Sequence, residues 1–301
     1  MSAPRGVAAR GAAARVATAG RARARGQARA QAIAVGILGA ATAAAIAALA
    51  FIVFFVLSRG LPSVTLEFLF SKPRGMGRSG GILPAIVGTF VLPALAIAIA
   101  LPLGAGTAIY LTEYTREGRL TRAIRFGSDC LAGIPSIIFG LFGYIFFVTT
   151  LGLGWSLLSG ALTLAIMILP TIIRTTEEAI RSVPRSWREV SLSLGATRWE
   201  TIVKVVLPNA LPGIVTGVML GLGRSIGETA AVIFTAGSSL RMPQSIMDST
   251  RTMAVHFYIL AREGISAEKA YGTAAVLVIS VLAVNAVTYW LMNRFIKRRA
   301  R

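Results

Sequence analysis

The sequence contains very little cysteine, histidine and charge for its length. Only one cysteine, Cys130, and one histidine, His256, occur among its 301 residues. These counts exclude a disulfide within the chain, a cysteine-based zinc or iron–sulfur site and a histidine cluster. Charged residues make up 14% and hydrophobic residues 55% of the chain, whereas soluble domains carry about 25% charged residues. The composition therefore predicts a polytopic membrane protein.

A nucleotide-hydrolysing P-loop is also missing. Such a loop needs a glycine–lysine pair, because backbone N–H groups and the lysine ammonium group must reach the phosphates together. None of the four lysines follows a glycine: Lys72, Lys204, Lys269 and Lys297. We therefore expect no enzymatic site and no cofactor in this chain, and any ATP hydrolysis, with its Mg, must occur on a partner.

Long apolar runs predict an all-α membrane protein with six transmembrane helices. A span needs about 20 apolar residues to cross a hydrocarbon core about 30 Å thick. The run from Cys130 to Ile173 is too long for one span, and Gly152-Leu153-Gly154 offers a turn that divides it. The predicted spans are Ile33–Leu57, a helix starting near Pro84 within Ser79–Thr112, Phe126–Thr150, Trp155–Ile173, Leu211–Ala236 and Tyr271–Met292.

The distribution of basic residues predicts that both termini are cytoplasmic. With that orientation the inner segments hold 22 Lys or Arg and the outer segments hold 8, as the positive-inside rule favours. Most of the net charge of +19 is then an orientation signal. The predicted parts are a disordered Arg/Ala-rich tail (1–32), the first span (33–57), an extracytoplasmic loop (58–81), a core (82–292) with a cytoplasmic segment at 174–210, and a basic tail (293–301).

The N-terminal tail combines arginine, alanine and glycine without any acidic residue. We favour contact with anionic lipid over a nucleic-acid function for this tail. A secretory signal fits less well, because the apolar run that follows is longer than the 7 to 15 residues usual for a signal h-region. No nucleic-acid partner is therefore expected.

The cytoplasmic segment has helical periodicity and predicts a helix-turn-helix over residues 184–208. Apolar positions recur at Trp187, Val190 and Leu194, and again from Trp199 to Val206. Gly195 suits a left-handed cap after the first helix. The second helix is expected to begin at a capping box and to stop at a proline; these positions are Thr197, Glu200, Leu207 and Pro208. An interfacial hairpin lying on the lipid is the alternative.

This segment resembles the EAA loop of ABC importer permeases, which docks into a groove of the nucleotide-binding subunit. The positions that match, or that adjoin the matching glycine, are Glu189, Gly195, Ala196, Leu207 and Pro208. The two alanines of the motif are replaced by Val190 and Ser191, and its isoleucine by Val205. The resemblance implies type I ABC importer permease architecture and assigns ATPase coupling to these residues.

Two opposite charges, Arg224 and Glu228, stand within the predicted fifth span. Each such charge costs on the order of 2.5 to 3.5 kcal/mol in the membrane, so neither is expected to face lipid. One interpretation is an i,i+4 ion pair that stabilises helix packing, although Arg before Glu is the less favourable order. The other is that Arg224 offers its guanidinium group to an oxyanion, with Glu228 competing for release and Ser225 and Thr229 donating hydroxyl groups.

The stretches GRSIGET, from residue 223, and GIPSIIFGLFG, from residue 133, resemble the phosphate-specific ABC importer permeases. Residues 252–273 resemble the PstA-type subunit more than its PstC-type partner. The family implies import of inorganic phosphate by alternating access in a prokaryotic inner or plasma membrane. It also implies three partners: a second homologous permease, a cytoplasmic ABC ATPase dimer and an extracytoplasmic phosphate-binding protein. Sulfate or molybdate transport is the alternative, and a membrane-embedded enzyme with Glu228 as base is a remote one.

Three further features have simple structural interpretations. Glycines repeat every fourth residue at Gly213, Gly217 and Gly221, and again at Gly223 and Gly227, which is typical of close helix packing. Asp129 is expected to pair with Arg125 near the cytoplasmic end of the third span. His256 is expected to be solvated or locally hydrogen-bonded in the outer loop, where contact with a binding protein is the alternative.

Overall fold

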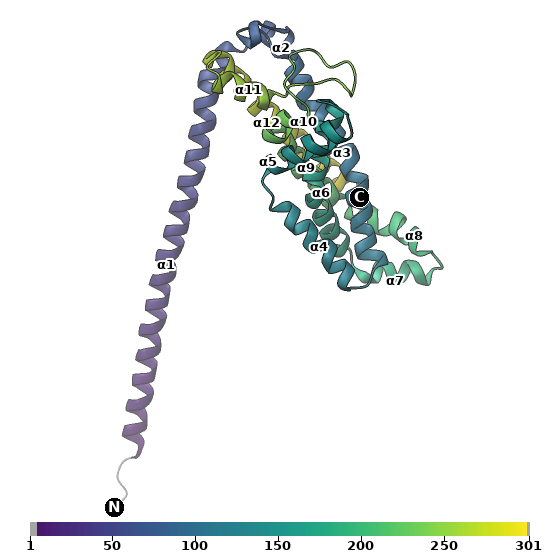
Figure 1. The fold of residues 1–301 in the computed structure, drawn as a ribbon. Helices are drawn as coiled ribbons and strands as arrows, with labels where there is room; N and C mark the ends of the chain where they lie inside the picture. The colour runs from purple at the N-terminus through teal and green to yellow at the C-terminus, as the bar shows by residue number, and fades with distance from the viewer. Residues whose placement is uncertain (1–4, 300–301) are drawn as a thin grey trace, which may run out of the picture. The chain divides into compact units, whose positions relative to one another are not determined.

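Long helices dominate the computed structural model, which describes the backbone of residues 5–299 and the side chains of residues 31–290 and Arg294 (Figure 1). This follows from the apolar runs, because a segment in lipid must satisfy its backbone hydrogen bonds internally. The chain forms two compact units, Met1–Phe55 and Val56–Arg301. Helix α1 (Arg5–Gly60) makes up nearly all of the first unit and ends in the second.

Most side chains of the predicted tail fall outside the described part of the chain. Residues 1–4 and the side chains of residues 5–30 are not described, nor are residues 300–301 of the basic C-terminal tail. Disorder and lipid contact in the N-terminal tail therefore stay predictions. The first predicted span lies inside α1, in an apolar stretch that covers Gln31–Ser63.

Five helical stretches are long and apolar enough to cross a membrane, and a bent helix pair makes a sixth. The five are Gln31–Ser63, Leu83–Tyr114, Leu157–Ser182, Arg198–Ile226 and Ala267–Trp290. The bent pair is Arg119–Ala132 with Ser136–Thr150. The predicted all-α fold with six spans is confirmed if the pair counts as one, while the orientation of the termini stays a prediction.

Short elements fill the loop predicted between the first two spans. They are the 3-10 turn η1 (Leu61–Ser63), α2 (Leu66–Phe70), β1 (Pro73–Arg74), the turn η2 (Gly75–Gly77) and β2 (Ser79–Gly80). The two strands pair antiparallel, with Pro73 opposite Gly80. The side chain of Thr65 caps α2 by accepting a hydrogen bond from the Phe68 N–H.

The remaining elements follow in order along the chain. They are α3 (Leu83–Ile109), the π-helix η3 (Tyr110–Tyr114), α4 (Arg119–Ala132), α5 (Ser136–Gly143), the π-helix η4 (Tyr144–Thr150), α6 (Leu157–Ser182), α7 (Arg185–Ser193), α8 (Arg198–Thr201), the π-helix η5 (Ile202–Val206), α9 (Leu207–Ile226), α10 (Ala230–Thr235), α11 (Met253–Arg262) and α12 (Ala267–Arg299).

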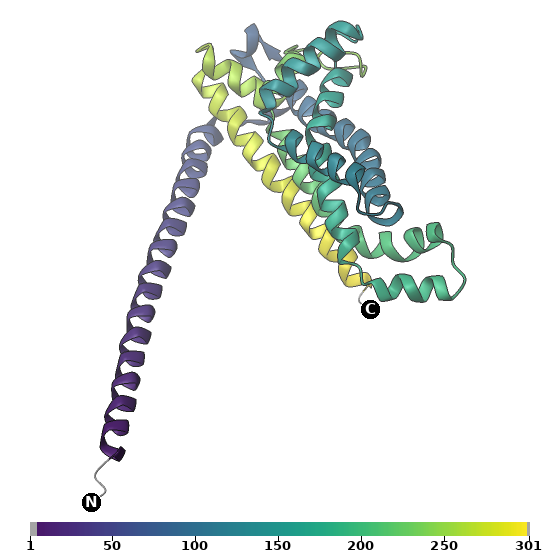
Figure 2. The same ribbon diagram turned by 60° about the horizontal axis from the view of Figure 1, so that its bottom comes forward.

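Helix α6 is the centre of the second unit, where it packs against α3 and α9. Leu92, Leu164 and Ile168 are fully buried in this core. In both ribbon views α7 and α8 extend from one end of the helical bundle (Figure 2). The cytoplasmic segment predicted from the sequence is therefore a projection from the packed helices.

The glycine repeat on α9 packs against α6, as predicted. A Cβ atom added at Gly213 would overlap the Ala179 side chain, and one added at Gly217 would overlap the Thr175 hydroxyl group. A Cβ atom at Gly221 would lie 3.6 Å from Ile168. The interpretation as a packing surface is confirmed for these three glycines but not for Gly223 and Gly227, where an added Cβ atom would meet nothing within 4 Å.

The predicted third span is not a single straight helix. Helices α4 and α5 are bent by 101° relative to each other. Gly133 follows α4 and Pro135 precedes α5, and a proline disfavours helical geometry in the residue before it. The predicted fourth span lies almost entirely in α6, which continues nine residues beyond Ile173 to Ser182.

Candidate functional site

The predicted helix-turn-helix is present and begins directly after α6. Helix α7 is followed by Gly195, whose φ of +88° lies in the left-handed region. This conformation favours glycine because it has no Cβ atom. Thr197 and Glu200 then form the predicted capping box: the Thr197 hydroxyl accepts the Glu200 N–H, and Glu200 accepts the Thr197 N–H at 3.0 Å. Local sequence signals thus placed both helix ends correctly.

Helix α7 presents most of its apolar side chains to the exterior. No residue of α7 is buried, and Trp187, Val190 and Leu194 are 48%, 60% and 83% exposed. Glu189 and Gly195 are exposed beside them, and Ala196 is half-buried. A cluster of exposed apolar side chains is typical of a contact surface.

The second helix divides its predicted apolar stripe between two environments. Trp199 and Val203 are exposed, whereas Ile202 and Val206 are buried. Val206 packs with Ile180 in a small core at the end of α6. This half of the segment therefore packs into the bundle through buried apolar side chains, which α7 does not.

The prediction that Leu207-Pro208 stops this helix is wrong. Helical backbone continues from α8 through η5 into α9, and both residues are half-buried. The Leu207 N–H bonds to the Ile202 carbonyl, five residues back. Since a proline lacks an N–H and clashes with the carbonyl four residues before it, a π-helical turn accommodates Pro208 by widening the preceding turn.

Arg224 and Glu228 do not lie on one helix, because α9 ends at Ile226 and α10 begins only at Ala230. The predicted fifth span is thus broken. In the described part of the chain no ion pair joins these two residues. The Glu228 carboxylate instead accepts the N–H groups of Thr229 and Ala231, at 3.2 and 3.3 Å.

Each of these charges lies at the helix end where the helix dipole stabilises it. Arg224 is exposed in the last turn of α9, next to the negative end of the dipole. Glu228 satisfies N–H groups at the start of α10, next to a positive end. The break explains why an i,i+4 pair does not form.

The two hydroxyl groups predicted to assist Arg224 lie in different settings. Ser225 is 1% exposed and has no hydrogen-bond partner for its hydroxyl in the described chain. Thr229 is half-buried, and its hydroxyl lies 3.5 Å from the Gly227 carbonyl oxygen. Of the two, only Thr229 reaches a partly open surface near the break.

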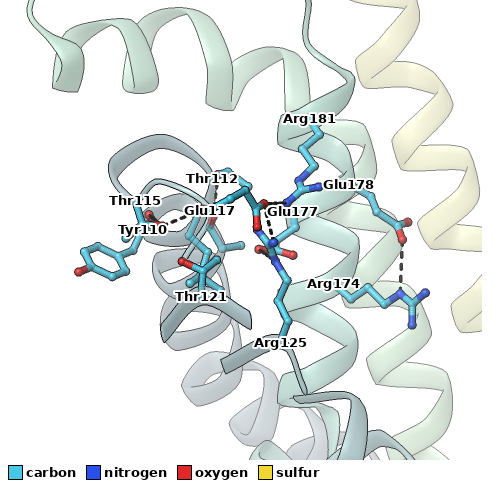
Figure 3. Close-up of polar contacts among 12 residues, drawn as sticks. Tyr110, Thr112, Thr115, Glu117, Thr121, Arg125, Arg174, Glu177, Glu178 and Arg181 are labelled. Atoms are coloured by element: carbon cyan, nitrogen blue, oxygen red, sulfur yellow. Dashed lines mark hydrogen bonds and ion pairs between the residues drawn. The ribbon is translucent and has the colours of Figure 1, made fainter. Parts of the chain in front are cut away.

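A cluster of charged side chains ties the C-terminal end of α6 to α4 and to the loop after η3. Arg125 contacts Glu117 at 2.7 Å and Glu177 at 3.3 Å, and Arg181 reaches Glu117 at 3.4 Å (Figure 3). The hydrogen bond from Arg125 lowers the pKa of the Glu117 carboxyl group. Asp129 lies 3.7 Å from Arg174, so its predicted pairing with Arg125 is wrong.

His256 is locally bonded, as expected, but it is not solvated. Its side chain is 1% exposed, and its Nδ1 lies 3.2 Å from the guanidinium group of Arg251. Burial, with a smaller contribution from the charge on Arg251, lowers the pKa of His256 to about 4. Arg251 also donates to the Ser238 carbonyl at 2.9 Å. This pair fastens α11 to the preceding loop.

Among the ion pairs that sequence reasoning missed is the one between Glu113 in η3 and Arg188 in α7, whose closest atoms are 2.8 Å apart. The available signals were weak: an acidic residue just after a long apolar run, and a basic residue directly before Glu189. Among the described residues, no group of three or more His, Cys, Asp or Glu could hold a metal ion.

Comparisons with known proteins agree with this architecture. A probable ABC transporter permease, YqgI of Bacillus subtilis (strain 168), is 34% identical over 88% of this chain and 96% of its own length. The phosphate transport system permease protein PstA 1 of Mycobacterium tuberculosis (strain H37Rv) is 37% identical over 74% of this chain and 72% of its own length.

Solved structures show the same fold. A chain of the MetNI methionine ABC transporter, in an inward-facing conformation, matches with a TM-score of 0.57 and 23% identity, over 71% of this chain and 94% of its own. A chain of a bacterial alginate ABC transporter matches with a TM-score of 0.57 and 15% identity, over 86% and 95%. The model of one family, described as the binding-protein-dependent transport system inner membrane component, matches residues 100–301. This match covers about two thirds of the sequence, and the chain therefore belongs to that family.

Proposed function

We propose that this chain is the permease subunit of an ATP-driven importer of inorganic phosphate. The observation that carries the proposal is the similarity to PstA 1 of Mycobacterium tuberculosis, a protein named for phosphate transport, over nearly three quarters of both chains. As a component of a transport system, the chain is a transporter subunit and not an enzyme. Transport proceeds by alternating access, and ATP and Mg bind to a separate subunit.

The partners follow from the same assignment. A cytoplasmic ABC ATPase dimer docks on α7, where Trp187, Val190 and Leu194 offer exposed apolar surface, and Glu189 and Gly195 complete the contact. A second, homologous permease completes the pathway, and an extracytoplasmic phosphate-binding protein delivers the anion. The complex resides in the prokaryotic inner or plasma membrane.

Arg224 is the residue best suited to meet the anion. Its guanidinium group is partly exposed and has no ion pair within the described chain, and such a planar fork binds oxyanions by two parallel hydrogen bonds. Glu228 lies just beyond the helix break and could accept a hydrogen bond from a protonated phosphate oxygen. Thr229 supports this site, whereas the burial of Ser225 makes a direct role for that hydroxyl less suitable.

Phosphate uptake in vesicles tests the substrate assignment. We expect ATP-driven uptake of radiolabelled phosphate to fall at least tenfold in Arg224→Gln, with normal assembly of the complex. Arg119→Gln is the matched control, because Arg119 is also at least partly exposed and outside any ion pair of the described residues. ATP-driven uptake of labelled sulfate or molybdate by the unaltered complex, without ATP-driven uptake of labelled phosphate, would replace phosphate with another oxyanion.

Co-purification of the ATPase tests the docking assignment. Gly195→Ala places a Cβ atom on a backbone with φ of +88°, at a cost of about 1–2 kcal/mol. We expect ATPase retention to fall several-fold, while membrane insertion is unchanged. Gly127→Ala is the control, since it lies within α4 and its Cβ atom would meet nothing within 4 Å. Full retention of the ATPase by the Gly195 variant would contradict docking at this turn.

A further inference from the structure

A bidentate ion pair joins the end of the second predicted span to α7. The Arg188 Nη2 and Nε atoms lie 2.8 and 3.0 Å from one Glu113 carboxylate oxygen, and Nε lies 3.4 Å from the other. The two side chains are 18% and 14% exposed. Several hydrogen bonds between the two side chains restrict their relative orientation more than a single contact would.

The same guanidinium group also binds the end of α6. Nη1 donates to the Val183 carbonyl at 2.7 Å, and Nη2 donates to the Ile180 carbonyl at 2.8 Å. These carbonyls belong to the last turn of α6 and the residue after it, where a helix leaves carbonyl groups without internal partners. Arg188 therefore connects three segments at once: η3, the end of α6 and α7.

Helix α7 has little else to hold it. None of its residues is buried, so α7 contributes no fully buried apolar side chain to the core of this chain. The other side-chain bond that attaches it to a neighbouring element is a 2.9 Å contact between the hydroxyl groups of Ser191 and Thr201. The helix that presents the exposed apolar surface is thus oriented chiefly by one arginine.

We infer that Arg188 is a positioning residue that transmits movement of α7 to the cytoplasmic ends of α3 and α6 through Glu113 and the two carbonyls. A force applied to the exposed face of α7 reaches η3 directly through the ion pair. This inference rests on the proposed function, in which an ATPase docks on that face. Its structural part, the fastening of α7 by Glu113 and Arg188, stands independently of the substrate.

The first measurement is hydrogen exchange of the α7 amides in the complete transporter complex. We expect Arg188→Gln and Glu113→Gln each to speed exchange over residues 185–193 at least fivefold. Arg185→Gln is the matched control, because it removes a cation from the same helix without breaking an ion pair of the described residues. Unchanged exchange in both variants would overturn the inference, whatever anion is carried.

The second measurement separates coupling from assembly. In vesicles containing the complete complex, we expect Arg188→Gln to retain the ATPase and to hydrolyse ATP, but to carry at least threefold fewer substrate ions per ATP. Arg188→Lys keeps the charge but not the guanidinium fork, so its number of ions carried per ATP should lie between those of the wild type and Arg188→Gln. A wild-type ratio in Arg188→Gln would overturn the inference, as would a normal ratio in Glu113→Gln, which would leave Arg188 as a cap of α6 alone. Failure of the unaltered complex to carry phosphate would instead contradict the proposed function.

Discussion

Arg224 and Glu228 are four residues apart in the sequence and do not pair, whereas Glu113 and Arg188 are 75 residues apart and form a bidentate ion pair. Arg224 lies in the last turn of α9 and Glu228 lies within the break before α10, and each interacts with the helix end next to it. The second two are brought together by the packing of α3 against α6 and the turn into α7. Spacing predicts a pair only where the helix between the residues is continuous.

The two regions also differ in what the charges do. At the break, a partly exposed guanidinium group without an ion pair in the described chain can meet a mobile ligand, while the nearby carboxylate is held by backbone N–H groups. At α7, the carboxylate and the guanidinium group satisfy each other in a mostly buried setting. The first arrangement suits transient binding, and the second suits transmission of force.

Charge reversal at Arg188 is expected to have the largest effect. Arg188→Glu places two carboxylates together in a mostly buried setting, so we expect a loss of about 3–5 kcal/mol in stability, seen as a lower melting temperature of the purified permease. Arg224→Glu, at a more open position, should cost about 1 kcal/mol or less. The double variant Glu113→Arg with Arg188→Glu should recover only part of the stability lost in Arg188→Glu, because residue 188 then has no donors for the α6 carbonyls. Equal losses of stability in Arg188→Glu and Arg224→Glu would contradict the difference proposed between the two regions.

Arg251 and His256 extend the comparison to a contact between two basic side chains. The pKa of His256 is about 4 when folded against 6.5 for the free side chain, so the folded state binds fewer protons between these values. The contribution of neutral His256 to the free energy of unfolding is therefore fully present above pH about 6.5. It is lost as the pH drops towards 4, by about 3 kcal/mol in all. Melting temperatures across this range should fall less steeply in His256→Gln. An identical pH slope in that variant would assign the effect to other groups.

Removal of the Glu228 carboxylate should have the smallest effect. Glu228→Ala deprives two N–H groups of their acceptor, at a cost of about 1 kcal/mol, whereas Glu228→Gln keeps an oxygen and should cost less. If Arg224 and Glu228 do not pair, Glu228→Ala lowers stability by the same amount in the wild-type chain and in the Arg224→Gln variant, within about 0.5 kcal/mol. A coupling energy above about 1 kcal/mol in this thermal double-mutant cycle would restore the ion-pair interpretation.

Predictions from the sequence were most accurate where the signal is local. The left-handed Gly195, the Thr197–Glu200 capping box and the glycine surface on α9 each depend on residues within a few positions, and all three are present. Predictions failed where backbone direction depends on more distant packing. The stop at Leu207-Pro208 and the continuous helix from Leu211 to Ala236 are the clearest cases.

The candidate site was predicted in part. The docking segment was located with its exposed Trp187 and Leu194, because amphipathic periodicity is visible in a single sequence. The burial of Ser225 and the break after Ile226 were not predictable from that periodicity, since the apolar run continues through both. The partner of Asp129 was also missed, because Arg174 reaches it from another helix.

The sequence by itself determined that this is a multi-pass helical membrane protein and where its apolar spans and helix caps fall. Those features follow from hydropathy and from hydrogen bonds between near neighbours. Only the tertiary structure decided that α4 and α5 bend by 101°, that α9 ends before Glu228, and that Glu113 meets Arg188. These outcomes depend on which helix faces pack together, because a contact across 75 residues exists only once α3, α6 and α7 are in place.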